Sequence, residues 1–473
     1  MIRRLFSLLL CGALLLSLSP PAAAWDGLSG ADAPVRAGTA GDVMYLDEYG
    51  QEKHTQEQGI QVTEVTADTT AWTNGWYVVN GEVPIASRIT VTGDVHLILA
   101  NDCTLNAENG GINVAEDNSL TIYAQSSGDS AGALVAVGNK YQAGIGGNTK
   151  QNSGSITING GTVNTTGGYM GAGIGGGRNG AGGNIIINSG KVTATTVQFG
   201  AGIGSGDQCS IYNNATNITI NGGDVTAIGV DSSAGIGGGS SGGGCTIKIT
   251  GGNVNAQGGV YASGIGSGRL GSNGIIEISG GVITTTGGIE GAGLGSGTGG
   301  KGGTITITGG TVNARGGNKG AGIGSGENGA GGTITITDGT INATGGNNGA
   351  GIGSGERGWG GTITITGGTV DATNENSGAG IGGSGTPGTF STGANGNAFI
   401  TTSSIADQSS KEDWSGVIFE GNDGAVYGEQ TIQTDTEIPA AKTLTIPDGS
   451  ILTISSGVTL TNNGTIINNG RST

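Results

Sequence analysis

Hydrophobic and polar residues alternate along short stretches in the middle of this 473-residue chain, as in TITIT at residues 304–308. Alternation of this kind predicts a β-strand with one buried face and one face in water. Two buried positions recur from stretch to stretch, and both are always isoleucine. The first set is Ile156, Ile185, Ile218, Ile247, Ile276, Ile305, Ile334 and Ile363, and the second is Ile158, Ile187, Ile220, Ile249, Ile278, Ile307, Ile336 and Ile365. We therefore expect one face of every such strand to pack in a core.

These stretches belong to a longer repeat with a Gly-Ile-Gly core. Its central residues are Ile145, Ile174, Ile203, Ile236, Ile265, Leu294, Ile323, Ile352 and Ile381. Their spacing is constant, except for one longer interval between Ile203 and Ile236. A fixed period of this length, about 29 residues, is typical of a solenoid, in which each unit buries its apolar face against its neighbours.

Each unit contains two further candidate strands. After a pair of glycines comes a column of β-branched residues: Val163, Val192, Val225, Val254, Ile283, Val312, Ile341 and Val370. The Gly-Ile-Gly stretch supplies the third strand, and glycines at the corners suit backbones that need positive φ or close approach. Strand–crossover–strand connections are nearly always right-handed. The repeat therefore predicts an all-β fold, a right-handed parallel β-helix with three short strands per coil of about 29 residues.

The N-terminus has the features of a secretory signal. Residues 1–24 combine the charged pair Arg3 and Arg4, an apolar stretch, and small residues before Trp25. This order predicts a signal peptide and an exported protein. No later apolar run is long enough to span a bilayer, so we expect no transmembrane segment.

The remaining sequence divides by its regularity. We expect a loose polar lead-in at 25–57, irregular coils that cap the β-helix at 58–142, the regular repeat at 143–385, and irregular C-terminal coils or a cap at 386–473. Caps are expected because an open β-helix end would expose an unpaired strand edge.

Composition excludes several classes of protein. Glycine accounts for 106 residues, but there are only 7 prolines and no three-residue period, which excludes collagen. The unbroken isoleucine columns argue against glycine-rich disorder. The formal net charge of −17 disfavours nucleic acid as a partner.

Three motifs resemble a group of exported bacterial surface proteins. They are YLDEYGQE at 45–52, the stretch from WTNGWYVV to GGINV at 72–114, and the repeats with GAGIGSG and TITITGGTVNA. Members of that group are described as carbohydrate-binding or pectin-lyase-like parallel β-helix proteins. The resemblance implies a protein exported to the cell surface, and it carries no mechanism.

Catalytic and metal sites are not indicated. Glycoside hydrolysis needs paired carboxylates, whereas the acidic residues here are scattered among the turns. Glu327 and Glu356 occupy the same position in adjacent units, which fits a solvated turn, and Glu290 and Lys319 predict a surface ion pair. The sequence GIGSGDQ at 202–208 is a lone match to calcium-binding turns. We therefore expect no enzyme, no catalytic residues, no metal and no cofactor.

Two cysteines fall in equivalent turns of consecutive coils. Cys209 lies in the longer interval after Ile203, and Cys245 lies one coil later. Adjacent strands are about 4.8 Å apart, within reach of a disulfide if the side chains converge. We predict a Cys209–Cys245 bridge and a buried, unbridged Cys103.

Aromatic residues gather four or five residues before the Gly-Ile-Gly isoleucine, at Tyr141, Tyr169, Phe199 and Tyr261. A row of exposed rings at coil spacing could stack on the sugars of an extended glycan, although the rings could instead only cover the corner glycines. A threonine column (Thr157, Thr219, Thr306, Thr335, Thr364) would suit an ice-binding solenoid, but Ile, Lys and Glu interrupt it.

Taken together, these features predict an exported, surface-associated, non-catalytic β-helix protein. Its expected role is adhesion or binding of an extracellular polysaccharide or cell-surface glycan. The alternative is a polysaccharide-active lyase or hydrolase of the β-helix type.

Overall fold

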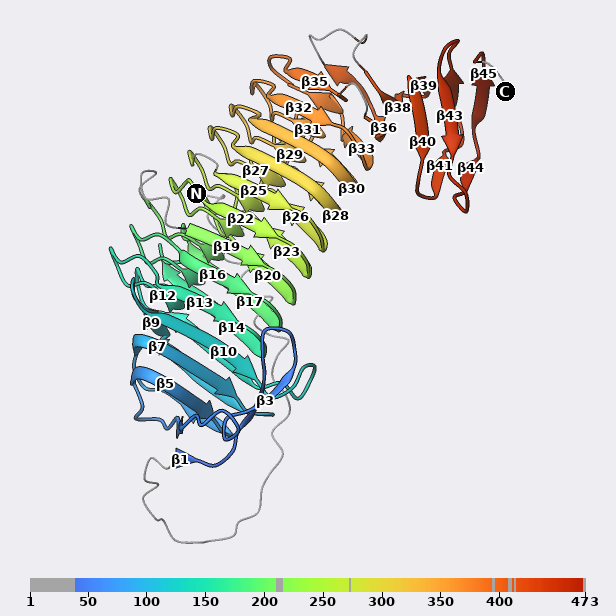
Figure 1. The fold of residues 1–473 in the computed structure, drawn as a ribbon. Helices are drawn as coiled ribbons and strands as arrows, with labels where there is room; N and C mark the ends of the chain where they lie inside the picture. The colour runs from blue at the N-terminus through green and yellow to red at the C-terminus, as the bar shows by residue number, and fades with distance from the viewer. Residues whose placement is uncertain are drawn as a thin grey trace, which may run out of the picture. The chain divides into compact units, whose positions relative to one another are not determined.

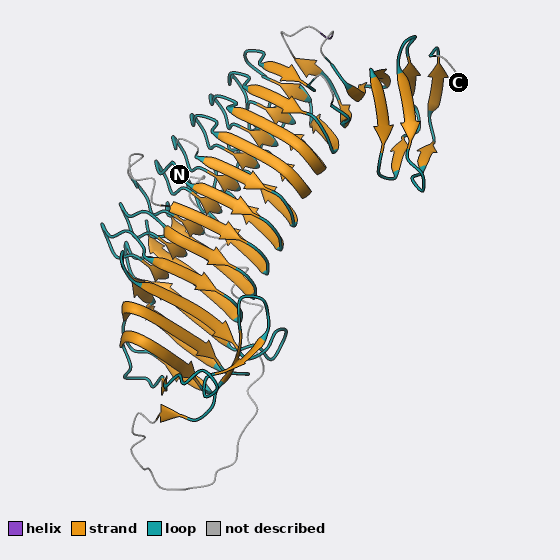
Figure 2. Ribbon diagram, viewed as in Figure 1, coloured by secondary structure: helices purple, strands orange, loops and turns teal. Residues whose placement is uncertain are grey.

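The computed structural model describes residues 39–209, 216–271, 274–393, 396–406, 411 and 414–470. The predicted signal peptide, residues 1–24, lies outside these residues. Within them the chain forms 45 β-strands and no α-helix (Figures 1 and 2). Successive coils of the regular part pair in parallel, one repeat period apart, as when Ile156 pairs with Ile185. The prediction of an all-β parallel β-helix with three strands per coil is confirmed.

The first strand of each coil comes from the alternating isoleucine stretch. Its bounds are β13 (Ser155–Ile158), β16 (Gly183–Ile187), β19 (Thr216–Ile220), β22 (Thr246–Ile249), β25 (Ile275–Ile278), β28 (Thr304–Arg315), β30 (Thr333–Gly345) and β32 (Thr362–Ile365). In β28 and β30 the strand continues through the first corner and includes the second strand of the coil. The interrupted threonine column also lies in register, with Lys248 opposite Glu277.

The second and third strands stack in the same way. The other second strands are β14 (Thr162–Tyr169), β17 (Lys191–Gln198), β20 (Asp224–Ile228), β23 (Asn253–Gln257), β26 (Val282–Thr286) and β33 (Thr369–Asn374). The third strands are β12 (Ile145–Gly146), β15 (Ile174–Gly175), β18 (Ile203–Gly204), β21 (Ile236–Gly237), β24 (Ile265–Gly266), β27 (Leu294–Gly295), β29 (Ile323–Gly324), β31 (Ile352–Gly353) and β34 (Ile381–Gly382).

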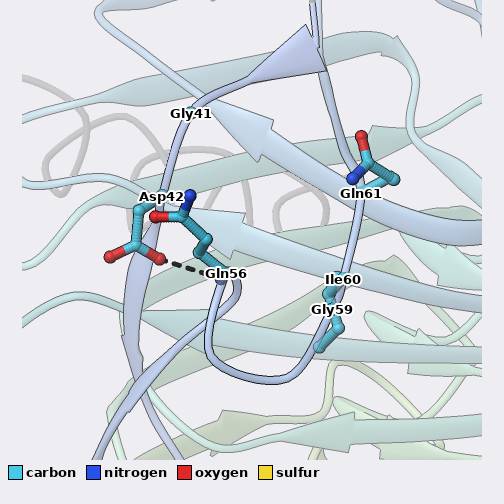
Figure 3. Close-up of a pocket in the computed structure, with 6 residues that line it drawn as sticks. All are labelled: Gly41, Asp42, Gln56, Gly59, Ile60 and Gln61. Carbon is cyan, nitrogen blue, oxygen red and sulfur yellow. Dashed lines mark hydrogen bonds between the residues drawn. The ribbon is translucent and has the colours of Figure 1, made fainter.

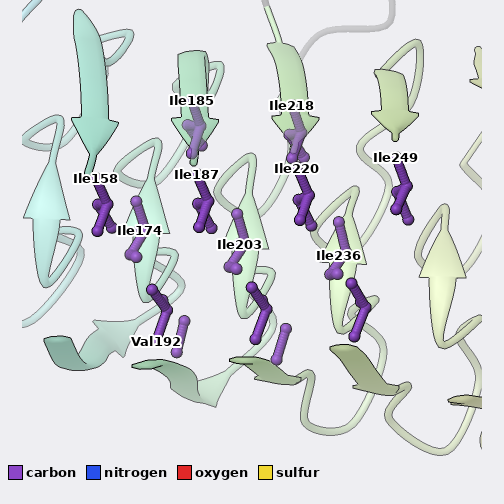
Figure 4. Packing of buried hydrophobic residues seen from close by; sticks show 14 of the residues in the cluster. Ile158, Ile174, Ile185, Ile187, Val192, Ile203, Ile218, Ile220, Ile236 and Ile249 are labelled. Atoms are coloured by element: carbon purple, nitrogen blue, oxygen red, sulfur yellow. The ribbon is translucent and has the colours of Figure 1, made fainter. Parts of the chain in front are cut away.

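The core consists of the inward columns that the alternation predicted. Figure 4 shows Ile185, Ile187 and Ile203 pointing into the interior, with equivalent residues repeated in neighbouring coils. Every isoleucine in the two columns is at most 1% exposed. Burial of one such side chain stabilises the fold by about 1.5–3 kcal/mol, so the stack of coils is held together mainly by this continuous apolar interior.

Glycine is required where the third strands approach one another most closely. Gly324 has a φ of +133°, and a Cβ atom there would overlap the carbonyl oxygen of Gly353 in the next coil. The same conformation recurs in every regular coil, at Gly146, Gly175, Gly204, Gly237, Gly266, Gly295, Gly353 and Gly382. Only glycine adopts this backbone conformation readily, which explains why the Gly-Ile-Gly core is so regular.

The irregular N-terminal coils use the same ladders. Their strands are β4 (Val62–Glu64), β5 (Ala71–Val79), β6 (Glu82–Pro84), β7 (Ile89–Leu99), β8 (Thr104–Gly110), β9 (Ile112–Val114), β10 (Ser119–Ala124) and β11 (Ala133–Gly138). β7 pairs in parallel with β10, and β10 pairs with β13, so the first-strand column continues without a break into the regular repeat.

Part of the predicted lead-in is ordered. β1 (Thr39–Ala40) pairs with β4, and β2 (Met44–Leu46) forms an antiparallel hairpin with β3 (Glu52–His54). Tyr45 in this hairpin is only 5% exposed, because its ring packs against Trp76 and Tyr123 of the first coils. From residue 39 onward the segment therefore packs against the β-helix, and the description of 25–57 as loose does not hold there.

Arg88 joins the irregular coils to the regular ones. Its guanidinium donates hydrogen bonds to the carbonyl of Gly110, to Ala143 at 2.9 Å and to Gly146 at 3.0 Å. Burial lowers the pKa of Arg88 to about 10, so the side chain remains a cation at neutral pH. One buried charge thus satisfies carbonyls from two successive coils.

The C-terminal coils change in size. β35 (Thr389–Ser391), β36 (Phe399–Thr402) and β37 (Ile405–Ala406) extend the three ladders, and β38 (Gly416–Glu420) then pairs antiparallel with β39 (Asp423–Tyr427). The last strands are β40 (Glu429–Ile432), β41 (Thr436–Ile438), β42 (Thr443–Ile446), β43 (Ile451–Ile454), β44 (Leu460–Asn462) and β45 (Thr465–Asn468). Glu429 pairs with Ile451 and Thr443 with Thr465, so these coils are shorter than those of the regular repeat.

A Gly324→Ala substitution should destabilise the stack locally. The new methyl group would meet the Gly353 carbonyl in a backbone conformation that alanine disfavours, at a cost of about 3 kcal/mol. Faster amide hydrogen exchange in β29 and β31 would report the loss. Gly41→Ala is the matched control, because nothing lies within 4 Å of its added methyl group. Equal exchange in the two variants would contradict this role for Gly324.

An Arg88→Ala substitution should destabilise the N-terminal coils by about 3 kcal/mol, because it leaves buried carbonyls without donors. Urea unfolding monitored by Trp fluorescence would measure the effect. Arg315→Ala removes an arginine that is 61% exposed and paired with Glu375, and should cost less than about 1 kcal/mol. An equally small loss in the free energy of unfolding for both variants would show that Arg88 does not join the irregular coils to the regular ones.

Candidate functional site

The variable residues of the repeat form two columns that lie side by side. They stand four residues before and four residues after each Gly-Ile-Gly isoleucine. The first column is Tyr141, Met170, Phe199, Ser232, Tyr261, Glu290, Lys319, Asn348 and Ser377, and the second is Thr149, Arg178, Asp207, Ser240, Arg269, Thr298, Glu327, Glu356 and Gly385. The amide of Arg178 donates to the carbonyl of Tyr141 at 3.0 Å, and the same bond joins Glu327 to Glu290 at 2.8 Å. We call these two columns the variable stripe.

Three corner residues at the aromatic end of the stripe have a left-handed backbone, which also recurs in the turns after the Gly-Ile-Gly cores, as at Asn328. Tyr141, Met170 and Phe199 have φ values of +70°, +71° and +65°. For residues other than glycine the left-handed conformation costs roughly 1–2 kcal/mol each. Glycine would adopt it freely, and this chain uses glycine 106 times. Large side chains are therefore retained at these corners in spite of the backbone cost.

Three of the four predicted aromatic residues lie together. The ring centroids of Tyr141 and Tyr169 are 5.9 Å apart, and those of Tyr169 and Phe199 are 5.7 Å apart. All three rings are partly exposed and come from three consecutive coils. Tyr261 is separated from them by the coil that carries Ser232, and its ring contacts Arg269 instead, at 5.5 Å. We call Tyr141, Tyr169 and Phe199 the aromatic row.

Charged residues surround the first ring of the row. Lys140 Nζ lies 4.9 Å from the centroid of Tyr141, and Arg178 Cζ lies 5.2 Å from it. Asp207, in the next coil, is only 3% exposed, and its Oδ2 has no hydrogen-bond partner among the described residues. Burial raises the pKa of Asp207 to about 6, although Arg178 opposes the rise. This end of the stripe thus combines partly exposed rings, cations and a buried carboxyl group.

The other end of the stripe is an ion-pair network. Lys319 Nζ lies 3.2 Å from Glu290 and 2.9 Å from Glu327, which confirms the Glu290–Lys319 pair. Arg357 lies 3.8 Å from Glu327 and 3.4 Å from Glu356. The sequence suggested a solvated turn for these two glutamates, but Glu327 is only 6% exposed. Because cations pair with each carboxylate, this end of the stripe is electrostatically satisfied by the protein itself.

The family comparison agrees with this architecture. A family model described as a β-helix repeat matches residues 156–178, 185–207, 218–240, 247–269, 305–327, 334–356 and 363–385. These seven segments are β-helix repeats, and the chain has a parallel β-helix fold. Each match runs from the first buried isoleucine of a coil to the second column of the stripe, so it includes both columns. No curated protein and no solved structure matches the chain.

The three cysteines among the described residues are buried. Cys209 and Cys245 are thiols in the structure, and the disulfide predicted between them is not formed there. Burial raises the pKa of the Cys245 thiol to about 12, with a smaller contribution from Cys209 nearby. A thiol with so high a pKa is a poor nucleophile at neutral pH. Cys103 is likewise a buried thiol, with its pKa raised by burial to about 11.

An aromatic group that the sequence did not reveal lies under the N-terminal hairpin. The rings of Trp76 and His96 stack at 4.3 Å, and Trp76 also stacks on Tyr123 at 5.2 Å. Trp76 and His96 are register partners on β5 and β7, so their outward side chains meet. Only the strand register could have indicated this pairing, because the sequence between the two rings is irregular.

The hairpin and its flanking turns, residues 42–60, form a strap over these rings. A cavity of about 140 Å³ lies where the strap begins and ends, lined by Gly41, Asp42, Gln56, Gly59, Ile60 and Gln61 (Figure 3). Ligand pockets are usually about 300–1,000 Å³, so this cavity is too small to be the main binding site. Beside it Asp42 holds the strap, by accepting a hydrogen bond from the amide of Gln56 at 2.9 Å.

The described residues contain neither a candidate metal site nor a candidate membrane-spanning helix. In the part of the chain that the structure describes, no group of three or more His, Cys, Asp or Glu residues is placed to hold a metal ion. Among the same residues, no helix is long and apolar enough to cross a membrane.

The strap should respond to pH through His54. Its Nδ1 lies 2.7 Å from Asp42 and its Nε2 lies 3.0 Å from Glu52, and these hydrogen bonds raise the pKa of His54 above its usual value. A raised pKa stabilises the strap fully below about pH 6.5, the unfolded value. The stabilisation is lost as pH rises through the folded pKa.

We expect hydrogen exchange in residues 43–55 to quicken as the pH rises above about 6.5, beyond the intrinsic rate change. His54→Gln should abolish this extra dependence, whereas His96→Gln should keep it. Exchange in the wild type that follows only the intrinsic rate would rule out the His54 contribution.

Proposed function

We propose that this β-helix repeat protein is an exported, surface-associated, non-catalytic protein that binds an extracellular glycan. The aromatic row is the observation that carries the proposal. Partly exposed Tyr141, Tyr169 and Phe199 lie on consecutive coils, with ring centroids 5.7 and 5.9 Å apart. The apolar faces of sugar rings pack on aromatic side chains, and Tyr hydroxyls can bond sugar hydroxyls. Export is supported by the signal peptide predicted at residues 1–24.

A second candidate is a polysaccharide-active enzyme, and Asp207 is the observation that favours it. A buried carboxyl group with a pKa of about 6 suits proton donation near neutral pH. Glycoside hydrolysis uses two carboxyl groups, whereas the acidic residues of this chain are scattered among the turns. We therefore place glycan binding first.

A glycan array combined with a product assay separates the two candidates. Tyr169→Ala should weaken binding at least about tenfold, or about 1.4 kcal/mol, because it removes the central ring of the row. Tyr49→Ala is the matched control, since Tyr49 is 79% exposed and far from the row in sequence. Absence of binding to every glycan would end the first proposal. New reducing or unsaturated ends that disappear in Asp207→Asn would favour the enzyme.

A further inference from the structure

Positive charge is concentrated beside the aromatic row, although the chain as a whole carries a net charge of −17. Lys140 and Arg178 lie over the ring of Tyr141 at 4.9 and 5.2 Å. Lys150 lies in the adjoining turn, where its amide donates to the carbonyl of Arg178 at 2.7 Å. Two cations from consecutive coils thus lie over one partly exposed ring, and a third belongs to the adjoining turn.

These three cations lie outside the ion-pair network of the stripe. Among the described residues, neither Lys140, Lys150 nor Arg178 forms an ion pair, whereas Lys319 and Arg357 each pair with two glutamates. Arg178 makes no side-chain hydrogen bond with any described residue, and its Nε is a buried donor without an acceptor. A buried donor that the protein leaves unsatisfied is costly, so a ligand acceptor at this place would remove the cost.

Asp207 does not neutralise the positive charge of Arg178, Lys140 and Lys150. Asp207 is close enough to Arg178 for the cation to oppose the rise in its pKa, but no ion pair forms between them. Because Asp207 is only 3% exposed, its charge is not presented to solvent beside Lys140 and Lys150. The accessible charge around Tyr141 is therefore positive.

We propose that the aromatic row binds an anionic sugar chain, with Tyr141 and Tyr169 packing on the rings and Arg178, Lys140 and Lys150 binding its carboxylate or sulfate groups. This inference rests on the proposed glycan binding and names the ligand class of the same site. The planar guanidinium of Arg178 suits either oxyanion, since it can donate two parallel hydrogen bonds. On a chain of net charge −17, a local basic group also favours anionic over neutral ligands.

A second contact between a cation and an aromatic ring, further along the stripe, favours an extended ligand. Arg269 lies over Tyr261 of its own coil at 5.5 Å, whereas Arg178 lies over Tyr141 of the preceding coil. Tyr261 is four coils further along than Tyr141, which corresponds to about 19 Å at the usual strand spacing. A chain of several sugars is long enough to reach both pairs, whereas a single sugar is not.

Three polymers with one backbone provide the test: dextran, carboxymethyl dextran and dextran sulfate. Binding of the intact mature protein to each is measured by calorimetry at about 50 and 200 mM salt, and we expect at least tenfold tighter binding of one or both charged polymers, weakened by salt. If only carboxymethyl dextran binds tightly, the ligand group is a carboxylate. If only dextran sulfate binds tightly, it is a sulfate. Tight binding of both polymers supports an oxyanion of either kind.

Substitutions of arginine test which side chain binds the anionic groups of the polymer. Arg178→Gln should weaken binding of the charged polymer at least tenfold, and Arg178→Lys should restore part of it. Arg315→Gln is the control, because Arg315 is exposed and already paired with Glu375. Thermal unfolding of each variant shows whether it is folded as the wild type is.

Two results would overturn the inference. The first is that the charged polymers bind no more tightly than dextran does. The second is that the Arg178→Gln variant is folded and binds the charged polymers as tightly as the wild type does. If a neutral glycan on the array still binds through Tyr169, the inference falls and the proposed function stands. If no glycan of any charge binds, both fall together.

Discussion

The close approach of successive coils along the Gly-Ile-Gly strands constrains the rest of this structure. At Gly324 the carbonyl of the next coil occupies the place that a Cβ atom would need, and the same holds in each regular coil. The hydrogen-bond ladders on the other two faces can stay parallel only if this third face keeps the same short spacing. The glycines therefore do more than permit a turn, since they let the third ladder keep the spacing that hydrogen bonds set in the other two.

A constraint this strict leaves little of the coil free to vary. Inward positions must fill a core of constant cross-section, and the glycine after each central isoleucine of the Gly-Ile-Gly core must remain glycine. Side chains can differ only on the outward strand faces and in the variable stripe. Along the stripe the chemistry changes from rings and unpaired cations near Tyr141 to a satisfied ion-pair network around Glu327. Regular packing and local chemical variety thus occupy separate positions of the same repeat unit.

The sequence predicted what depends on its period, and it did not predict what depends on the path of a turn. The isoleucine columns and the three strands follow from alternation and spacing alone, as Ile185 and Ile187 illustrate. The contact between Arg178 and Tyr141 depends on how a corner folds back across one coil, which no period encodes. The burial of Tyr45 does not follow from the sequence, because Tyr45 lies in a polar, aperiodic segment and the rings that it contacts are known only from the fold. Arg88 shows the same limit, because its carbonyl acceptors lie 22, 55 and 58 residues further along the chain. Spacing placed Cys209 and Cys245 in adjacent coils, but it could not show how their side chains point, and the structure has both as thiols.

The strict register has an evolutionary consequence. Each regular coil meets its neighbours through the same backbone ladders and the same inward columns, so gain or loss of one whole coil by recombination leaves the core packing of the remaining coils unchanged. The longer interval between Ile203 and Ile236 shows that a turn can also accept extra residues while the ladders on either side stay paired. The distance between Tyr141 and Tyr261 could therefore change in whole-coil steps, and such genetic rearrangement would match the reach of the stripe to polymers of different repeat length.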